Sequence, residues 1–79
     1  MNKKVYNAVK SGRADDNINF SDFRNLIVDL GFECQRQEGS HRMYRHMIYR
    51  EKMNIQQDGN KAKGYQVRQL RKIMKKYNM

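Results

Sequence analysis

The chain contains no proline, no tryptophan and only one cysteine, Cys34. A single cysteine cannot form a disulfide within the chain, and its isolation is consistent with a reducing compartment. No stretch approaches the roughly 20 apolar residues of a membrane-spanning helix, and no apolar run of signal-peptide length follows Lys3 and Lys4. We therefore expect a soluble, cytoplasmic protein with no membrane association.

Acidic residues are scarce in the second half of the chain. Residues 41–79 carry eleven Lys and Arg against only Glu51 and Asp58, whereas residues 1–40 carry six residues of each sign. The whole net charge of +9 therefore lies in the second half. Such asymmetry is typical of a surface that binds a polyanion, most often nucleic acid, and the alternative interpretation is a cationic face kept for solubility.

Two segments have the apolar periodicity of a helix. The first is predicted over residues 21–30, with Ser21 as the N-cap and Gly31 just beyond the end. Its apolar stripe consists of Phe23, Leu26, Ile27 and Leu30. The second is predicted over residues 65–77, where an apolar face lies beside a basic stripe: Val67, Leu70, Ile73, Met74 and Tyr77 against Arg68, Arg71, Lys72 and Lys75.

Between these helices the period changes to that of strands. Residues 32–37 alternate as a half-buried strand does, with Cys34 expected inside, and a turn over Glu38-Gly39-Ser40 predicts a hairpin. The return strand covers residues 41–46, with Tyr44 expected in the core, and a third strand covers residues 53–57 before a loop at 58–61. Met43, Met53 and Met74 are expected to fill gaps in a small core.

These elements predict a single α+β domain with a small three-stranded antiparallel sheet and two helices on one face, in the order α-β-β-β-α. The 79 residues suffice for one domain but not for two. Residues 1–10 also have a weak helical pattern, so an additional N-terminal helix remains an alternative. We therefore divide the chain into an N-terminal extension, 1–19, and a main domain, 20–79.

One motif in this arrangement resembles a known family. Gly39-Ser40-His41-Arg42-Met43-Tyr44 at the hairpin, Asn54-Ile55-Gln56 on the third strand and the residues 61–67 that open the last helix are similar to the HicA family of mRNA interferase toxins. The resemblance covers roughly residues 20–77. It implies a fold like the double-stranded-RNA-binding domain, a metal-independent endoribonuclease of a type II toxin–antitoxin system active in stress responses, and a HicB-type antitoxin as partner.

The resemblance assigns catalysis to His41 alone. RNA carries its own nucleophile, the 2′-hydroxyl, so an enzyme needs mainly a base for its proton and cations for the transition state. Histidine suits the first task because it titrates near neutral pH. A histidine often found after the third strand in relatives is missing here, where Asp58 and Gly59 stand, which leaves His46 as the only other imidazole. We expect His46 to be a strand-end residue rather than a general acid.

Substrate contacts are expected from the turn and from the basic second half. The expected substrate-binding residues are Gly39, Ser40, Arg42, Lys61, Lys63, Arg68, Arg71 and Lys72, and Tyr44, Tyr49 and Tyr65 could stack on bases. Single-stranded RNA is the favoured substrate because its bases and 2′-hydroxyls are free to move. Cys34, His41 and His46 lack the spacing of a zinc site, so no metal or cofactor is expected. The free protein is expected to be a monomer or a weak dimer.

Two other functions remain open at this point. A binding module of the same fold would retain RNA without cutting it, and His41 would then be an ordinary surface histidine at a hairpin end. An interaction protein would use the basic face for an acidic partner. Charge alone does not separate RNA binding from protein binding, since an antitoxin would occupy much of the same face.

Overall fold

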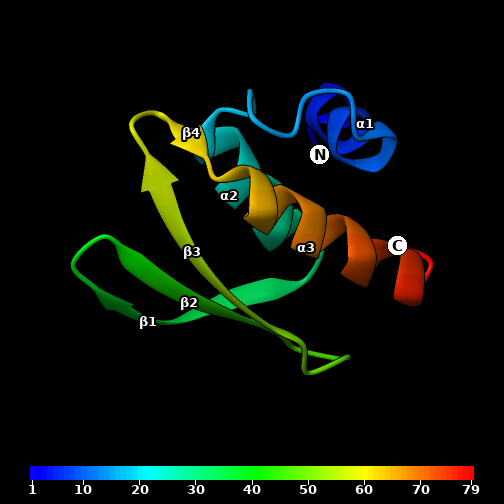
Figure 1. The fold of residues 1–79 in the computed structure, drawn as a ribbon. Helices are drawn as coiled ribbons and strands as arrows, with labels where there is room; N and C mark the ends of the chain where they lie inside the picture. Colours follow the sequence, from blue (N-terminus) through cyan, green and yellow to red (C-terminus); the bar gives the residue numbers. More distant parts are fainter.

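The computed structural model describes all residues, 1–79, and confirms the α+β class (Figure 1). Three helices and four strands follow one another in the order α1 Lys3–Ser11, α2 Phe20–Asp29, β1 Phe32–Glu38, β2 His41–His46, β3 Lys52–Asp58, β4 Lys61–Ala62 and α3 Gly64–Lys76. The weak helical pattern at the start of the chain is therefore a helix. No helix has the length and apolarity needed to cross a bilayer.

The four strands form one antiparallel sheet in the order β1-β2-β3-β4, each paired with its neighbour in sequence. The predicted hairpin between β1 and β2 is confirmed: Glu38 pairs with His41 across a two-residue turn. Gly39 has φ +58° in that turn, a conformation that favours glycine.

The sheet has four strands where the sequence predicts three. The additional strand, β4, has two residues, and so short a segment cannot show the apolar–polar alternation from which a strand is predicted. It pairs with the end of β3 and also with the chain that enters α2: Ala62 N donates to Ile18 O (2.9 Å), and Phe20 N donates to Asn60 O (2.8 Å).

This pairing also moves the start of α2. The Asn19 side chain caps the helix, its Oδ1 accepting from Asp22 N (3.1 Å), so the predicted cap at Ser21 is wrong by two residues. The extended backbone that pairs with β4 ends at Asn19, which is the residue placed to cap the following turn. Beyond the helix, Gly31 has φ +105° and ends it as predicted.

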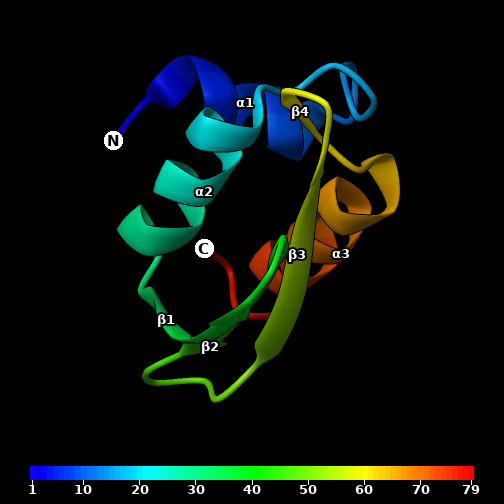
Figure 2. The same ribbon diagram turned by 90° about the vertical axis from the view of Figure 1, so that its left-hand side faces the viewer.

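The core lies between the helices and one face of the sheet (Figures 1 and 2). Both predicted helical stripes face it, and Leu30 and Tyr77 at their ends are partly buried. Tyr44, Met53 and Met74 are buried as expected, and burial raises the pKa of the Tyr44 hydroxyl. Met43 lies half-buried on the opposite face of β2, so its expected place in the core is wrong: alternation along the strand turns it away from the face that carries Tyr44.

Cys34 is exposed, so its predicted burial is wrong. Only Phe32 of β1 reaches the core, and the rest of that edge strand projects beyond it. The register also shifts between Cys34 and Arg36, where a bulge breaks the alternation on which the prediction rested.

Helix α1 belongs to the same core as the rest of the chain. Val5 and Val9 are buried in the main hydrophobic cluster. Arg71 of α3 donates two hydrogen bonds to the Asp15 carboxylate (2.8 and 2.9 Å) and one to the Val9 carbonyl (3.0 Å). Residues 1–19 are therefore fastened to α3 by both apolar contacts and a bidentate ion pair.

Asp15→Asn is expected to lower stability at neutral pH by about 1–3 kcal/mol, since it removes the charge from a largely buried pair. The Arg71 hydrogen bonds hold the pKa of Asp15 below its ordinary value of 3.8. A carboxyl with a lowered native pKa stabilises the fold above the unfolded value, and this contribution is lost as the pH falls through the native one. Urea unfolding between pH 7 and about pH 3 should therefore show a smaller acid-induced loss in Asp15→Asn than in wild type. Asp16→Asn is the matched control, and an equal change in both variants would contradict the prediction.

Candidate active site

His41 is the first residue of β2 and directly follows the Gly39-Ser40 turn. Its backbone lies between Glu38 of β1 and Gln56 of β3. Side chains alternate along β2, so Tyr44 and His46 enter the core while His41 and Met43 lie on the outer face. The imidazole is exposed, as predicted for a group that must reach a bulky substrate.

A chain of side-chain hydrogen bonds ties the His41 turn to the start of α3. Gln56 Nε2 donates to Ser40 Oγ (3.0 Å), and Gln56 Oε1 accepts from Lys63 Nζ (3.0 Å). One amide thus holds the residue before His41 on one side and an ammonium group on the other. This arrangement fixes the Lys63 ammonium on the side chain of Gln56, the residue that pairs with His41 across β2 and β3.

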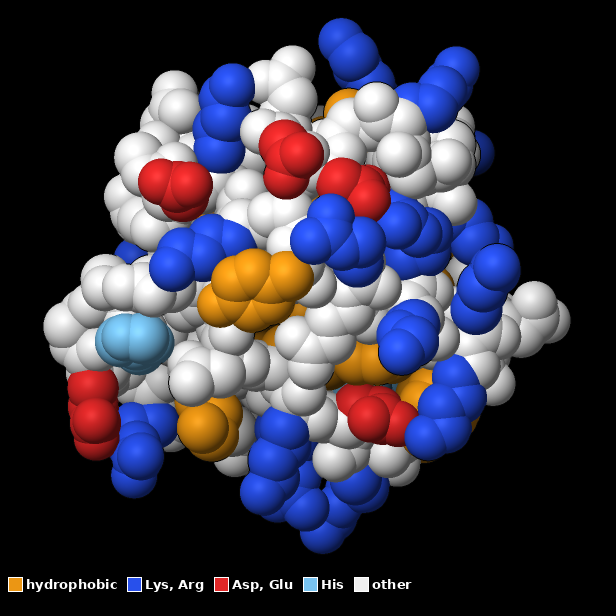
Figure 3. Space-filling view, in the orientation of Figure 1, with side chains coloured by type: hydrophobic (Ala, Val, Ile, Leu, Met, Phe, Trp, Pro, Cys, Tyr) orange, Lys and Arg blue, Asp and Glu red, His pale blue; other side chains and the backbone are white.

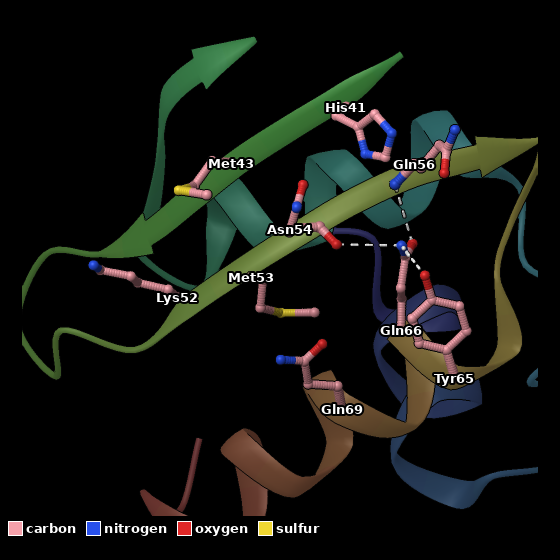
Figure 4. A pocket seen from close by; sticks show the side chains of 9 residues that line it. All are labelled: His41, Met43, Lys52, Met53, Asn54, Gln56, Tyr65, Gln66 and Gln69. Atoms are coloured by element: carbon pink, nitrogen blue, oxygen red, sulfur yellow. Dashed lines mark hydrogen bonds between the residues drawn. The ribbon is translucent and has the colours of Figure 1, made fainter. Parts of the chain in front are cut away.

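Gln66 completes the wall that faces this turn. Its side chain is 1 % exposed and bridges the outer edge of β3: Oε1 accepts from Gln56 N (3.3 Å), and Nε2 donates to Asn54 O (3.2 Å). The amide thus replaces the peptide groups of a neighbouring strand where β4 is too short to reach. It also donates to Tyr65 Oη (3.3 Å), so α3, Tyr65 and β3 form one unit (Figure 4).

These residues line a groove of about 370 Å³ with His41 at its upper end in Figure 4. Its other lining residues are Met43, Lys52, Met53, Asn54, Gln56, Tyr65, Gln66 and Gln69. No acidic side chain faces it, and no three His, Cys, Asp or Glu side chains of the protein gather closely enough to hold a metal ion.

A second, cationic groove of about 520 Å³ follows α3 and shares Tyr65 and Gln69 with the first. Its remaining lining residues are all basic: Arg68, Arg71, Lys72 and Lys75. Figure 3 shows the face that carries an exposed histidine, with Lys and Arg side chains spread across it. The predicted basic stripe therefore continues towards His41 rather than lying on a separate side of the protein.

The structure does not bring all of the predicted substrate contacts together. Arg42 lies on the helix side of the sheet, half-buried, with its guanidinium carbon 5.6 Å from the centre of the Phe20 ring. Arg71 is held by Asp15, and Lys61 Nζ donates to Asn17 Oδ1 (2.6 Å). Arg68 and Lys72 line the cationic groove, and Ser40 and Lys63 are hydrogen-bonded to Gln56 of the His41 groove.

His46 is buried, and both of its ring nitrogens are hydrogen-bonded to backbone groups. Its side chain is 3 % exposed, Nε2 lies 2.7 Å from Leu30 O, and Nδ1 lies 3.1 Å from both Ile48 N and Tyr49 N. The two N–H donors at Nδ1 assign the proton to Nε2. Because both ring nitrogens are engaged inside the protein, His41 is the only imidazole that faces the groove.

The residues that sequence reasoning missed are the amides. The sequence predicts no role for Gln69, and Asn54, Gln56 and Gln66 enter it only as part of the motif. The sequence contains a signal for Asn54 and Gln56: they flank the buried Ile55 in a strand, so they must share the outer face of the sheet with His41.

Family models, curated proteins and solved structures were all compared with this chain, and none of them matches it.

Proposed function

We propose that this protein is an endoribonuclease that cleaves single-stranded mRNA without a metal, with His41 as general base, and that it acts as the toxin of a type II toxin–antitoxin system. The observation that carries the proposal is the exposed His41 imidazole in a groove that shares Tyr65 and Gln69 with a cationic one, with Gln56 linking the neighbouring Ser40 hydroxyl to the Lys63 ammonium. The similarity of Gly39-Ser40-His41 and its surroundings to HicA toxins supports the same function.

The reaction needs nothing beyond RNA and water. His41 takes the proton of a 2′-hydroxyl, and the 2′-oxygen forms a bond to the adjacent phosphorus. The bond from phosphorus to the 5′-oxygen breaks, the 5′-oxygen takes a proton from solvent, and the products are a 2′,3′-cyclic phosphate and a 5′-hydroxyl. Lys63 offsets the extra negative charge of the pentacoordinate transition state, while Arg68 and Lys72 hold flanking phosphates.

The proposed physiological partner is an acidic antitoxin of the HicB type. A protein that covers the cationic groove would compete with RNA for Arg68, Lys72 and Lys75. Inhibition would then follow from occupancy of the same surface, without any change in the fold.

The product ends test this function directly. Purified protein in EDTA is expected to cut a labelled single-stranded RNA and to leave 2′,3′-cyclic phosphate and 5′-hydroxyl ends, which mapping by end-specific enzymes identifies. A 2′-deoxy substitution at a mapped cut should abolish cleavage there, because it removes the nucleophile. Cleavage that needs a divalent cation, or that survives the 2′-deoxy substitution, would contradict the proposal.

An RNA-binding module that does not cut is the second candidate. The observation in its favour is that His46 is buried, so the groove contains one imidazole and no carboxylate. This function predicts RNA retention that weakens steeply with salt, because phosphate contacts release counterions, together with intact RNA after long incubation.

A further inference from the structure

The His41 groove and the cationic groove differ in chemistry. The cationic groove is lined by four Lys and Arg side chains and suits phosphates. The His41 groove contains one permanent charge, Lys52, and four side-chain amides. At about 370 Å³ it has the size of a small-molecule site, for which the usual range is roughly 300–1,000 Å³. Its lining suits a neutral polar group rather than a phosphate.

Two of the four amides are free to bind a ligand. Gln56 and Gln66 are engaged with Ser40, Lys63 and the β3 backbone. Asn54 and Gln69 are exposed, and their amides make no hydrogen bond within the protein. In Figure 4 the Asn54 amide lies on the His41 side of β3, and the Gln69 amide points from α3 towards the same strand. Each offers a donor beside an acceptor, the pattern that matches a base edge.

Tyr65 adds an aromatic face between the two grooves. The side chain is 57 % exposed, and the Gln66 hydrogen bond to its hydroxyl anchors the ring. A nucleobase stacks well on a tyrosine of this kind, and stacking accepts any base. Stacking on Tyr65 would therefore supply affinity, whereas discrimination would come from Asn54 and Gln69.

We propose that the His41 groove is a nucleobase pocket in which a single unpaired base stacks on Tyr65 and is read by the free amides of Asn54 and Gln69, with adenine as the preferred base. Each amide can pair bidentately with an edge that presents a donor beside an acceptor, and adenine presents two such edges at once, N6–H with N1 and N6–H with N7, whereas an unpaired pyrimidine presents one at a time. The sugar–phosphate backbone of the same RNA molecule then continues over Arg68 and Lys72. This inference rests on the proposed RNA function and names the residues that give it base selectivity.

Binding of RNA analogues that cannot be cut tests the pocket independently of catalysis. Fluorescence anisotropy would be measured with short 2′-O-methyl oligonucleotides of A, C or U, whose blocked 2′-oxygen removes the nucleophile. Wild type is expected to bind the A oligonucleotide about fivefold or more tightly than the others, the size of one good bidentate contact. Asn54→Ala and Gln69→Ala should each shrink this ratio, and Tyr65→Ala should weaken all three oligonucleotides by about fivefold or more.

Two matched variants separate the pocket from general RNA affinity. Asn25→Ala removes an exposed amide from α2, which contributes no residue to either groove, and should change nothing. Lys72→Ala should weaken all three oligonucleotides and leave their ratio unchanged, because it acts on phosphates. Equal binding of the three oligonucleotides, a preference for another base, or an adenine preference that is undiminished in both Asn54→Ala and Gln69→Ala would overturn the base pocket. Wild type that binds the analogues but never cuts unmodified RNA would instead overturn the endoribonuclease and leave the pocket standing.

Discussion

His41→Ala is expected to lower RNA cleavage by about 10²–10⁴-fold, the usual contribution of a positioned general base. No other imidazole faces the groove, so no second histidine can take over the proton. The loss should lie in the chemical step, and RNA affinity should change little because the phosphate contacts come from α3. Single-turnover cleavage, with RNA binding measured in parallel, checks both parts. Induction of the variant in cells should no longer arrest growth.

The control for this variant is its fold. The His41 side chain is exposed and makes no hydrogen bond within the protein, so the free energy of unfolding of His41→Ala should lie within about 0.5 kcal/mol of the wild-type value. The truncated side chain leaves open space in the groove, and added imidazole should restore part of the cleavage. Full activity of the variant would remove His41 from the mechanism, and lost activity with lost RNA binding would make its role one of binding alone.

The parts of the fold that could be predicted are those that local patterns encode. The stripes at Phe23 to Leu30 and Val67 to Tyr77, and the turn at Gly39, all follow from residues close together in sequence. Strand β4 and the Asn19 cap depend on pairing between segments that are far apart in sequence, and the exposure of Cys34 depends on a bulge in the pairing of β1 with β2. A single sequence contains no pattern for such contacts, so these three features could not be predicted.

The candidate site divides in the same way. His41 was found because a motif marks it, and its exposure follows from strand alternation. Arg42 is predicted from its charge and its place next to His41, and Arg71 from the basic stripe, but the structure engages Arg42 with Phe20 and Arg71 with Asp15. The sequence does not reveal whether a basic side chain will pair with a carboxylate or an aromatic ring from another part of the fold. The Gln56 and Gln66 bridges escaped prediction for the same reason.

The second histidine should respond to mutation in the opposite way. His46→Ala is expected to destabilise the protein by about 3–5 kcal/mol, the range for truncating a buried aromatic side chain. The change removes the ring that packs on Phe32 and Tyr49, and it deprives Leu30 O and two loop N–H groups of their partners. Urea denaturation followed by circular dichroism measures the loss.

His46→Asn separates the hydrogen bonds from the packing. The asparagine side-chain oxygen can accept from Ile48 N and Tyr49 N in place of Nδ1, whereas the bond to Leu30 O and the ring contacts are lost. His46→Asn should therefore be destabilised about half as much as His46→Ala. Because His46 lies behind the sheet and away from the groove, cleavage per folded molecule should remain near wild type in both variants, measured where the protein is still folded. A His46 variant that keeps its stability but no longer cuts RNA would contradict this assignment, since the buried ring would then be taking part in proton transfer and the single-imidazole mechanism would be wrong.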